Sequence, residues 1–338
     1  MMEIRMKPRI DLENRTKLET VIPLRTPFII NVDPSDRCNF QCKFCPTGDR
    51  ARMKRISRPM ATMDFSLFKK IVDDIGEFEA PLKVLRLYKD GEPLLNPRFA
   101  DMVKYAKESR RILRVDTTTN ASLLNPKRNL EIIEAGLDRI NISVEGVSEK
   151  QYKEFSNYRI NFDKFVENIA HYYENKGQCE VFIKINGDIL SAEDKSRFLE
   201  IFKDKADKIN IEHVMSCWPE FELPDGLAIN RERGIYGQEI REISVCPYVF
   251  YSFSINSDGL ASACFLDWSR KLIVGDANKQ RVKQIWDGIE LLEYQKMFLL
   301  KKRKEHAVCG KCGQMTHGMP DDIDKYAEEV LDKLQLKG

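Results

Sequence analysis

The sequence lacks several features that would assign it to common classes of protein. No stretch of eighteen consecutive apolar residues occurs in its 338 residues, so no segment is predicted to span a membrane. Basic and acidic residues nearly balance, 55 against 53, which gives no electrostatic reason to expect a nucleic-acid partner. The first thirty residues show no signal-peptide pattern, so we expect a cytoplasmic protein with reduced thiols.

Histidine is scarce as well, and this bears on the nine cysteines. Three of them form a CxxxCxxC run at Cys38, Cys42 and Cys45, and no histidine lies within ten residues of it. Zinc sites usually close with a fourth Cys or His at short spacing, and an odd number of cysteines in a long chain argues against a disulfide framework. Three thiolates would instead leave one iron of a four-iron cluster open for a small molecule.

The run Cys38 to Cys45, with the aromatic Phe44 before its last cysteine, resembles the cluster motif of the radical S-adenosylmethionine (radical SAM) superfamily. The resemblance implies a [4Fe-4S] cluster whose open iron binds S-adenosylmethionine. It also implies reductive cleavage to a 5′-deoxyadenosyl radical, with electrons from a reductant such as flavodoxin or ferredoxin. The basic run that follows, Arg50 to Arg58, is interpreted as a solvated, flexible loop.

Short β-rich runs alternate with amphipathic helical runs along the first two thirds of the chain. This alternation predicts a parallel sheet with helices outside it. Six such units match the partial (β/α)6 barrel of the family. The expected strands are 28–32, 84–88, 113–117, 140–144, 181–185 and 209–214, and the expected helices are 64–76 (capped by Thr62), 96–109, 126–135, 162–175 and 192–204.

In such barrels the chemistry gathers at the carboxyl ends of the strands. Asp90-Gly91-Glu92 follows the second expected strand and is similar to the family's GGE motif. By this resemblance, Gly91 allows close backbone approach and Glu92 holds the amino group of S-adenosylmethionine. Asp90 stands where the family has its first glycine, so the contact at that position is left open.

Four further residues are candidate contacts to S-adenosylmethionine. Asn120 lies in a segment similar to the family's Thr-Asn-Gly run, and Ser143 shares a strand face with Asn141 and Glu145, similar to the ISxDG run. Arg159 precedes the 162–175 helix, where relatives place an arginine against the carboxylate of S-adenosylmethionine. Asn186 ends the fifth expected strand.

A second set of cysteines lies near the end of the chain, at Cys246, Cys264, Cys309 and Cys312. Residues 253–260 predict a β-hairpin with its turn at Asp258-Gly259, which would bring Cys246 and Cys264 together across two strands. The later CxxC supplies two more thiolates, so four ligands close the site. On spacing alone, a zinc ribbon and an iron–sulfur cluster fit equally well.

The pattern C-x(9–15)-G-x4-C with later cysteines resembles the SPASM domain appended to radical SAM enzymes, and 275–286 is similar to that domain's GN...IW segment. The resemblance favours a second [4Fe-4S] cluster. Since no cysteine follows Cys312, it implies the shortened twitch form, as in the radical SAM dehydrogenase type that acts on 2-deoxy-scyllo-inosamine. The expected organisation is an extension (1–26), a radical SAM core (27–225), a linker (226–245), an α+β twitch/SPASM-like domain (246–318) and a C-terminal helix (319–338).

We therefore expect a radical SAM oxidoreductase that oxidises a secondary alcohol of a sugar-like or cyclitol-like small molecule, with the second cluster as electron acceptor. Asp267 is a candidate base for the hydroxyl proton. Epimerisation is an alternative, with Cys217 returning hydrogen, and so is peptide modification, although fewer than thirty residues precede the first strand. A zinc-stabilised, non-enzymatic scaffold is the alternative from another class.

Overall fold

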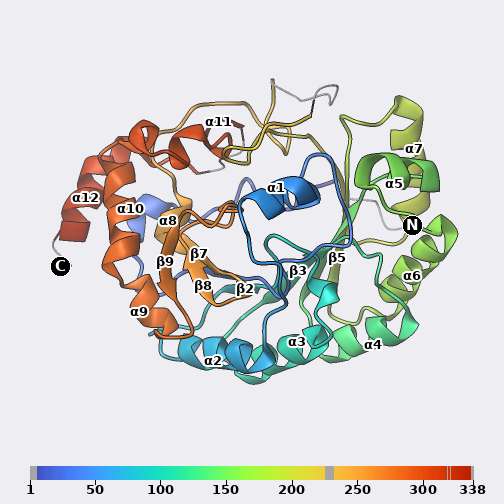
Figure 1. The fold of residues 1–338 in the computed structure, drawn as a ribbon, viewed down its shortest axis with the longest axis horizontal. Coiled ribbons are helices and arrows are strands. Elements are labelled where there is room, and N and C mark those ends of the chain that lie inside the picture. Colours follow the sequence, from blue (N-terminus) through green and yellow to red (C-terminus); the bar gives the residue numbers. More distant parts are fainter. Residues whose placement is uncertain (1–5, 225–231, 318, 320, 336–338) are drawn as a thin grey trace.

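One curved sheet of nine strands runs through the computed structural model, which describes residues 6–224, 232–317, 319 and 321–335 (Figure 1). Its strand order is β6-β5-β4-β3-β2-β1-β7-β8-β9. The strands are β1 (Ile29–Val32), β2 (Val84–Arg86), β3 (Val115–Thr119), β4 (Arg139–Val144), β5 (Glu180–Asn186), β6 (Lys208–Glu212), β7 (Ser252–Ile255), β8 (Leu260–Ser262) and β9 (Ile273–Asp276). Strands β1 to β6 follow one another in chain order and pair in parallel, which confirms the predicted partial (β/α)6 barrel.

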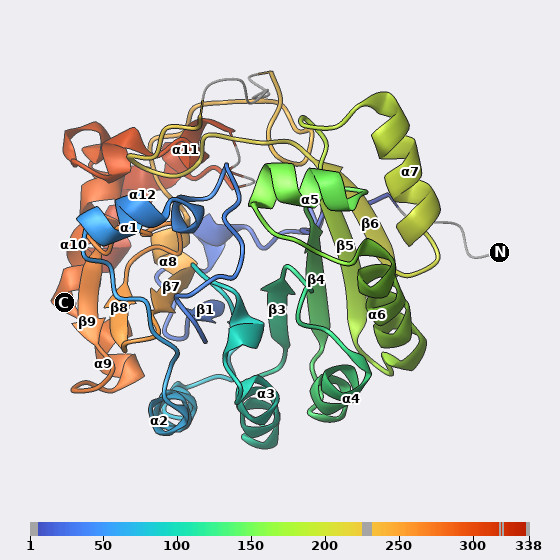
Figure 2. The ribbon, with the colours of Figure 1, turned by 45° about the vertical axis from the view of Figure 1, so that its right-hand side comes forward.

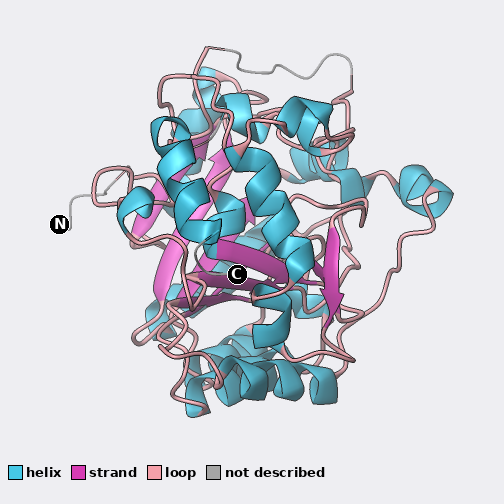
Figure 3. Cartoon of the chain, turned by 90° about the vertical axis from the view of Figure 1, so that its left-hand side faces the viewer, coloured by secondary structure: helices cyan, strands magenta, loops and turns pink. Residues whose placement is uncertain are grey.

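Helices enclose the sheet (Figure 3). Helices α2, α3, α4 and α6 cover the outer face of the barrel strands, whereas α1 and α5 lie beyond the carboxyl ends of the strands (Figure 2). The helices are α1 (Arg50–Arg55), α2 (Phe65–Ile75), α3 (Phe99–Glu108), α4 (Pro126–Glu134), α5 (Glu149–Ser156), α6 (Phe162–Asn175), α7 (Ala192–Phe202), α8 (Tyr248–Tyr251), α9 (Val282–Trp286), α10 (Ile289–Leu299), α11 (Gln314–His317) and α12 (Ala327–Gln335). None of the described helices has the length and apolar character needed to cross a membrane.

The smaller C-terminal α+β part continues the barrel sheet. Strand β7 pairs in parallel with β1, with Ile29 opposite Ser252, and β8 and β9 add antiparallel strands. The predicted hairpin is present, and Gly259 in its turn has a φ of +90°, a left-handed conformation that favours glycine. The strand that leads to the first cysteines is therefore held on both sides.

Alternation along the strands separates an apolar outer face from a polar inner face. Ile140, Ile142 and Val144 of β4 are buried in the core under the helices, so Asn141 and Ser143 face into the barrel. At the level of Arg86, one register row of inward residues crosses the sheet: Asn31, Arg86, Asp116, Arg139 and Glu180. At this level the barrel interior therefore carries charged and polar side chains.

The structure corrects three details of the sequence-based prediction. Helix α2 is capped by Asp64, which accepts from the backbone N–H groups of Ser66 and Leu67, and not by Thr62. Strand β3 begins at Val115 and not at residue 113, and the Leu113 side chain is 63% exposed. The basic run after the first cysteines is not a loop: Arg50–Arg55 forms helix α1, capped by Asp49.

The segment that precedes β1 crosses from the edge of the barrel to the C-terminal region. Met6 forms an isolated parallel β-bridge with Ile209, and the Lys7 N–H donates to the Ile209 carbonyl at 3.3 Å. Arg15 forms a two-pronged ion pair with Asp321 at 2.5 and 2.6 Å. The segment thus ties β6 to the end of the chain.

Several predicted domain limits fall on residues outside the described ranges. These are residues 1–5 of the 1–26 extension, residue 225 and residues 226–231 at the core–linker boundary, residue 318 at the end of the second domain, and residues 320 and 336–338 of the C-terminal segment. Within that last segment the structure shows α12 over Ala327–Gln335.

Candidate active site

The first three cysteines lie in the loop that β1 delivers to the carboxyl end of the barrel. Neighbouring segments hold this loop: Gln41 and Lys43 donate backbone N–H groups to the carbonyls of Ser156 and Phe155 at the end of α5, at 2.8 and 3.1 Å. The ring of Phe40 packs 4.5 Å from that of Tyr158. A loop fixed at this many points presents its side chains with little freedom to move.

The thiols of Cys38, Cys42 and Cys45 are half-buried and are neighbours. Burial raises the pKa of Cys38 to about 12, with a smaller contribution from Glu92, and it raises the pKa of Cys42 well above its usual value. Ionisation of Cys38 and Cys45 would raise the pKa of Cys42 further, since like charges would meet. A cation shared by the three thiolates would therefore stabilise their ionised form.

Gly91 allows the loop after β2 to reach this cysteine loop. A Cβ at this position would lie 2.1 Å from the Ser35 carbonyl oxygen and 2.3 Å from that of Arg37. Glu92 N–H then donates to the Arg37 carbonyl at 2.7 Å. The glycine thus sets the backbone that directly precedes Cys38.

Glu92 is almost fully buried beside the same loop. Its carboxylate accepts from Thr119 Oγ1 at 2.6 Å, from Asn120 N–H at 2.8 Å and from Leu94 N–H at 3.0 Å. Burial raises the pKa of Glu92 to about 7, although these three hydrogen bonds oppose the change. One lone-pair position on Oε2 is left for a further donor.

Asn120 connects this carboxylate to the cysteines. Its side-chain amide donates to Asn39 Oδ1 at 2.9 Å and lies 4.0 Å from Cys38 Sγ, while its Oδ1 accepts from Ser122. The structure therefore brings Gly91, Glu92 and Asn120 together with Cys38.

The other three predicted contacts make no hydrogen bond to the cysteine loop among the described residues. Ser143 is partly exposed on β4, in register with Lys184 of β5. Arg159 is exposed between α5 and α6 and makes no hydrogen bond or ion pair among the described residues. The amide oxygen of Asn186 accepts from Asp188 N–H at 3.2 Å, so it supports the turn after β5.

The four later cysteines come together in a pocket of the C-terminal part. Cys246, Cys264, Cys309 and Cys312 line it with apolar side chains, among them Leu266. Burial raises the pKa of each thiol, and for Cys246 and Cys264 the neighbouring thiols raise it further. Cys246 lies before α8 and not on a strand of the hairpin, so the predicted arrangement across two strands is wrong although the two thiols do meet.

Models of known families match most of the chain. The model of the radical SAM superfamily matches residues 32–226, and that of SPASM, an iron–sulfur cluster-binding domain, matches residues 246–313. The chain belongs to the radical SAM superfamily.

Curated relatives of this radical SAM enzyme are distant. It is 29% identical over 172 residues to the GTP 3′,8-cyclase of Clostridium perfringens, which covers 51% of this chain and 50% of the cyclase. It is 21% identical over 330 residues to the AdoMet-dependent heme synthase of Methanosarcina barkeri, which covers 85% and 88% of the two chains. The chain thus spans about half the length of the cyclases that it matches.

Solved structures share the fold at low identity. BtrN in complex with AdoMet and 2-DOIA has a TM-score of 0.56 at 17% identity and covers 88% of this chain and 97% of that one. SuiB of Streptococcus suis bound to the precursor peptide SuiA has a TM-score of 0.61 at 14% identity, with 88% and 72% covered. AnSMEcpe with bound AdoMet has a TM-score of 0.60 at 13% identity, with 92% and 97% covered.

The cofactors of the radical SAM enzyme are S-adenosylmethionine and iron–sulfur clusters. The donors present fit them, because the first site offers three neighbouring thiols and the second offers four. The iron–sulfur assignment of the second domain also sets aside the zinc scaffold.

The position of Asp267 does not suit a substrate base. Its carboxylate is fully buried and accepts from Ser262 Oγ, Lys271 N–H and Leu272 N–H, all at 2.9 Å. These bonds hold the turn between β8 and β9 that carries Cys264. Asp267 is therefore a structural residue of the second cysteine site.

Cys217 lies between the two cysteine sets. Its backbone carbonyl is 3.7 Å from Cys312 Sγ, and burial, Cys312 and, more weakly, Cys45 raise the pKa of its thiol to about 12. The thiol is therefore protonated at neutral pH.

A buried ionic cluster near the cysteines was not found from the sequence. The carboxylates of Asp33, Asp36 and Asp90 lie within 4.8 Å of one another. Lys89, Arg58 and Arg270 pair with Asp90, and Arg270 also pairs with Asp36, whereas burial raises the pKa of Asp33. Only the departure at Asp90 from the family glycine signalled something unusual. We assign the group as an ionic cluster and not a metal site, because three cations already pair with Asp36 and Asp90.

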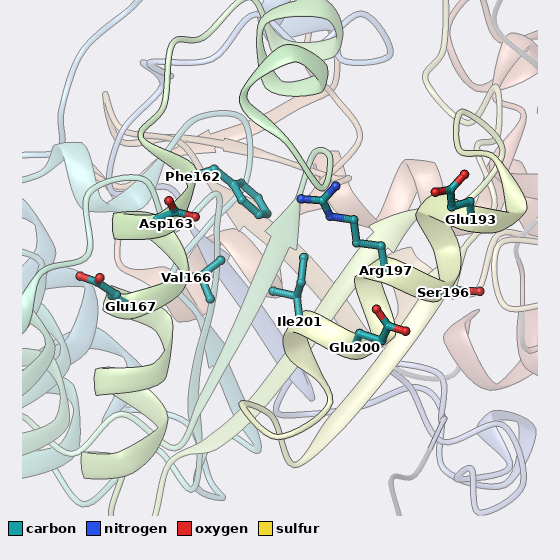
Figure 4. Close-up of a pocket in the computed structure, with 9 residues that line it drawn as sticks. All are labelled: Phe162, Asp163, Val166, Glu167, Glu193, Ser196, Arg197, Glu200 and Ile201. Carbon is teal, nitrogen blue, oxygen red and sulfur yellow. The ribbon is translucent and has the colours of Figure 1, made fainter.

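A larger hollow, of about 600 Å³, lies on the outside of the barrel between α6 and α7 (Figure 4). Four acidic side chains and Arg197 surround it, and it includes none of the predicted site residues. The residues that line it are Phe162, Asp163, Val166, Glu167, Glu193, Ser196, Arg197, Glu200 and Ile201.

Proposed function

We propose that this radical SAM enzyme oxidises a secondary alcohol of a sugar-like or cyclitol-like small molecule to a ketone. The observation that carries the proposal is the second site, where four thiols line one pocket and would saturate a four-iron cluster, leaving no iron for substrate. A saturated cluster is suited to accept an electron. The shared fold with BtrN, solved with AdoMet and 2-DOIA, is consistent with this reaction.

Cys38, Cys42 and Cys45 would hold the first cluster in this proposal, and Cys246, Cys264, Cys309 and Cys312 would hold the second. Gly91, Glu92 and Asn120 would position S-adenosylmethionine, with Ser143, Arg159 and Asn186 as outer contacts. When bound, these cofactors supply the radical that takes hydrogen from the carbinol carbon and the acceptor for the remaining electron. We place the enzyme in the cytoplasm, where flavodoxin or ferredoxin would reduce it.

The hydroxyl proton needs an acceptor, and Glu145 is better placed than Asp267. The Glu145 carboxylate makes no hydrogen bond with any described residue, and it is close enough to Cys42 for its charge to raise the pKa of that thiol. Burial raises the pKa of Glu145 to about 7, opposed by Lys184. A base with this pKa is poised to take a proton at neutral pH.

The test is anaerobic incubation with dithionite, S-adenosylmethionine and candidate alcohols, followed by measurement of 5′-deoxyadenosine and product mass. Oxidation removes about two mass units, one hydrogen atom and one proton with its electron. Iron and sulfide near eight each per chain should accompany activity. Glu145→Gln should retain iron and lose ketone formation. Full activity in this variant would show that Glu145 is not the base.

Epimerisation is the second candidate, because the protonated thiol of Cys217 lies beside both cysteine sets and could return a hydrogen atom. Cys217→Ala should leave a dehydrogenase active. Loss of activity, with an unchanged product mass and solvent deuterium in the wild-type product, would identify an epimerase instead. Peptide modification is a third candidate, since SuiB was solved with a precursor peptide, and small-molecule turnover would argue against it.

A further inference from the structure

The barrel interior contains an arginine whose hydrogen-bonding capacity is unused. Leu85 and Leu87 are fully buried on the outer side of their strand, so Arg86 between them points inward. Its side chain is nevertheless 27% exposed, although β2 lies within the sheet. The interior at this level is therefore open to water.

A second arginine reaches the same place from the N-terminal segment. The backbone carbonyl of Arg9 accepts from Arg139 Nη1 at 3.0 Å, which fixes the segment across the barrel. The Arg9 guanidinium lies near Tyr236, Tyr88 and Glu212, which raise its pKa, and its positive charge opposes the raised pKa of Arg86.

Most donors of this pair have no partner among the described residues. Arg86 makes no hydrogen bond within the described residues, and its sole ion pair joins Nε to Asp116 Oδ2 at 3.6 Å. Within the described part of the chain, the Arg9 side chain donates one hydrogen bond, to Tyr236 Oη at 3.4 Å. A guanidinium has five N–H donors, so nearly all of the ten in this pair lack an acceptor there.

The two lysines of the interior have close carboxylate partners, whereas Arg139 Nε lies 3.8 Å from Glu180 Oε1. Lys184 Nζ lies 2.6 Å from Glu212 Oε2, and Lys208 Nζ lies 2.8 Å from Glu180 Oε1. The arginine pair therefore differs from these paired lysines. Two like charges held side by side repel each other, and a shared anion relieves that repulsion.

We propose that Arg9 and Arg86 bind an oxyanion group of the substrate, a phosphate or a carboxylate, inside the barrel. Planar guanidinium forks match such groups in a bidentate way. The hydroxyls of Tyr88 and Tyr251, which lie near Arg86 and make no hydrogen bond to any described residue, are additional donors. This inference rests on the proposed function and narrows its substrate to an anionic sugar-like or cyclitol-like molecule.

The test measures anion binding to the reconstituted holoprotein, without turnover. Inorganic phosphate and acetate are titrated separately by calorimetry in anaerobic buffer, which distinguishes the two oxyanions. Arg9→Gln and Arg86→Gln should each weaken binding of the preferred anion by about tenfold or more. Arg25→Gln is the matched control, since its exposed ion pair with Glu79 lies on the surface, and it should bind as the wild type does.

Arg86→Lys and Arg9→Lys keep the charge but lose the fork, so they should bind more strongly than the Gln variants and more weakly than the wild type. Iron content and thermal unfolding identify a variant that has failed to fold. Absence of binding by the wild type, or equal binding by the wild type and both Gln variants, would overturn the proposal.

Turnover then separates this inference from the proposed function. Anion binding that depends on both arginines, without ketone formation from phosphorylated or carboxylated alcohols, would uphold the anion site and reject the dehydrogenase. Oxidation of a neutral cyclitol by a protein that binds neither anion would do the reverse.

Discussion

At the scale of single residues, the site depends on groups whose ionisation burial has changed. Glu92 accepts three hydrogen bonds and still has a pKa of about 7, because burial disfavours its charged form more strongly than those bonds favour it. An amino group that donates to the free position on Oε2 would favour the ionised carboxylate. Binding and protonation at Glu92 should therefore be coupled.

The first prediction concerns the pH dependence of S-adenosylmethionine binding. Glu92 is neutral below its raised pKa, so affinity should fall by up to about tenfold per unit as the pH is lowered below about 7. Glu92→Gln should bind weakly and show a flatter pH profile. Equilibrium dialysis under anaerobic conditions gives both profiles, and parallel profiles would show that Glu92 is not the coupled group.

The second prediction concerns Gly91→Ala. The new Cβ would overlap the carbonyls of Ser35 and Arg37, so the segment before Cys38 must move, at a cost of about 3 kcal/mol in the free energy of unfolding. Iron should fall to about four per chain, because only the first site is distorted.

Gly237→Ala is the control for that variant. Its Cβ meets no atom within 4 Å, yet its φ of +81° makes alanine unfavourable by about 1–2 kcal/mol. It should retain the iron of both sites. Equal iron loss in the two variants would mean that the close approach at Gly91 does not matter.

At the scale of elements, short turns position the second set of cysteines. The turn between β8 and β9 depends on the Asp267 carboxylate, which accepts three hydrogen bonds from nearby donors. Replacing this carboxylate should have different results if Asp267 is a substrate base and if it is a residue that holds the turn.

Asp267→Asn should therefore lose iron from the second site and destabilise the fold by about 1–3 kcal/mol, since a donor amide replaces one acceptor oxygen. The first site should keep its iron. Asp287→Asn, at an exposed ion pair with Lys283, serves as the control and should change neither quantity. Normal iron content with loss of product alone would restore Asp267 as the base.

The elements that the sequence predicted well are those with local signals. Strand runs, helix periodicity and cysteine spacing are all read within a few residues, and they gave the barrel and both sets of thiols. The cap at Asp64 and the start of β3 differ by about two residues from the prediction. The ends of helices and strands are the least certain part of such a prediction, because neighbouring residues can each serve as the boundary. Helix α1 was missed because its packing partners, Phe221 and Trp268, are distant in the sequence.

At the scale of the whole molecule, long-range contacts join the two cysteine sites. Arg270 of the C-terminal part pairs with Asp36 and Asp90, so it reaches both the first cysteine loop and the loop after β2. Burial alone would raise the pKa of Asp90, but Lys89, Arg58 and Arg270 outweigh it and hold that pKa below its usual value. Spacing along the chain contains no signal for a contact across more than two hundred residues.

Arg270→Gln should accordingly destabilise the holoprotein by about 3–5 kcal/mol, because it leaves buried carboxylates with too little positive charge. Arg270→Lys should recover part of this loss. Denaturant unfolding followed by circular dichroism measures both. A change below about 1 kcal/mol in the Gln variant would show that Lys89 and Arg58 suffice to balance the cluster.

The pairing of β7 with β1 has a consequence for attempts to divide the enzyme. A fragment ending at residue 224 would uncover the β1 edge along Ile29–Val32, and unpaired N–H and C=O groups on such an edge recruit other chains. We expect that fragment to self-associate on size-exclusion chromatography even when its three thiols are intact. The barrel half is then not an independent unit, and exchanging the C-terminal half between relatives requires a strand that pairs with β1 as β7 does.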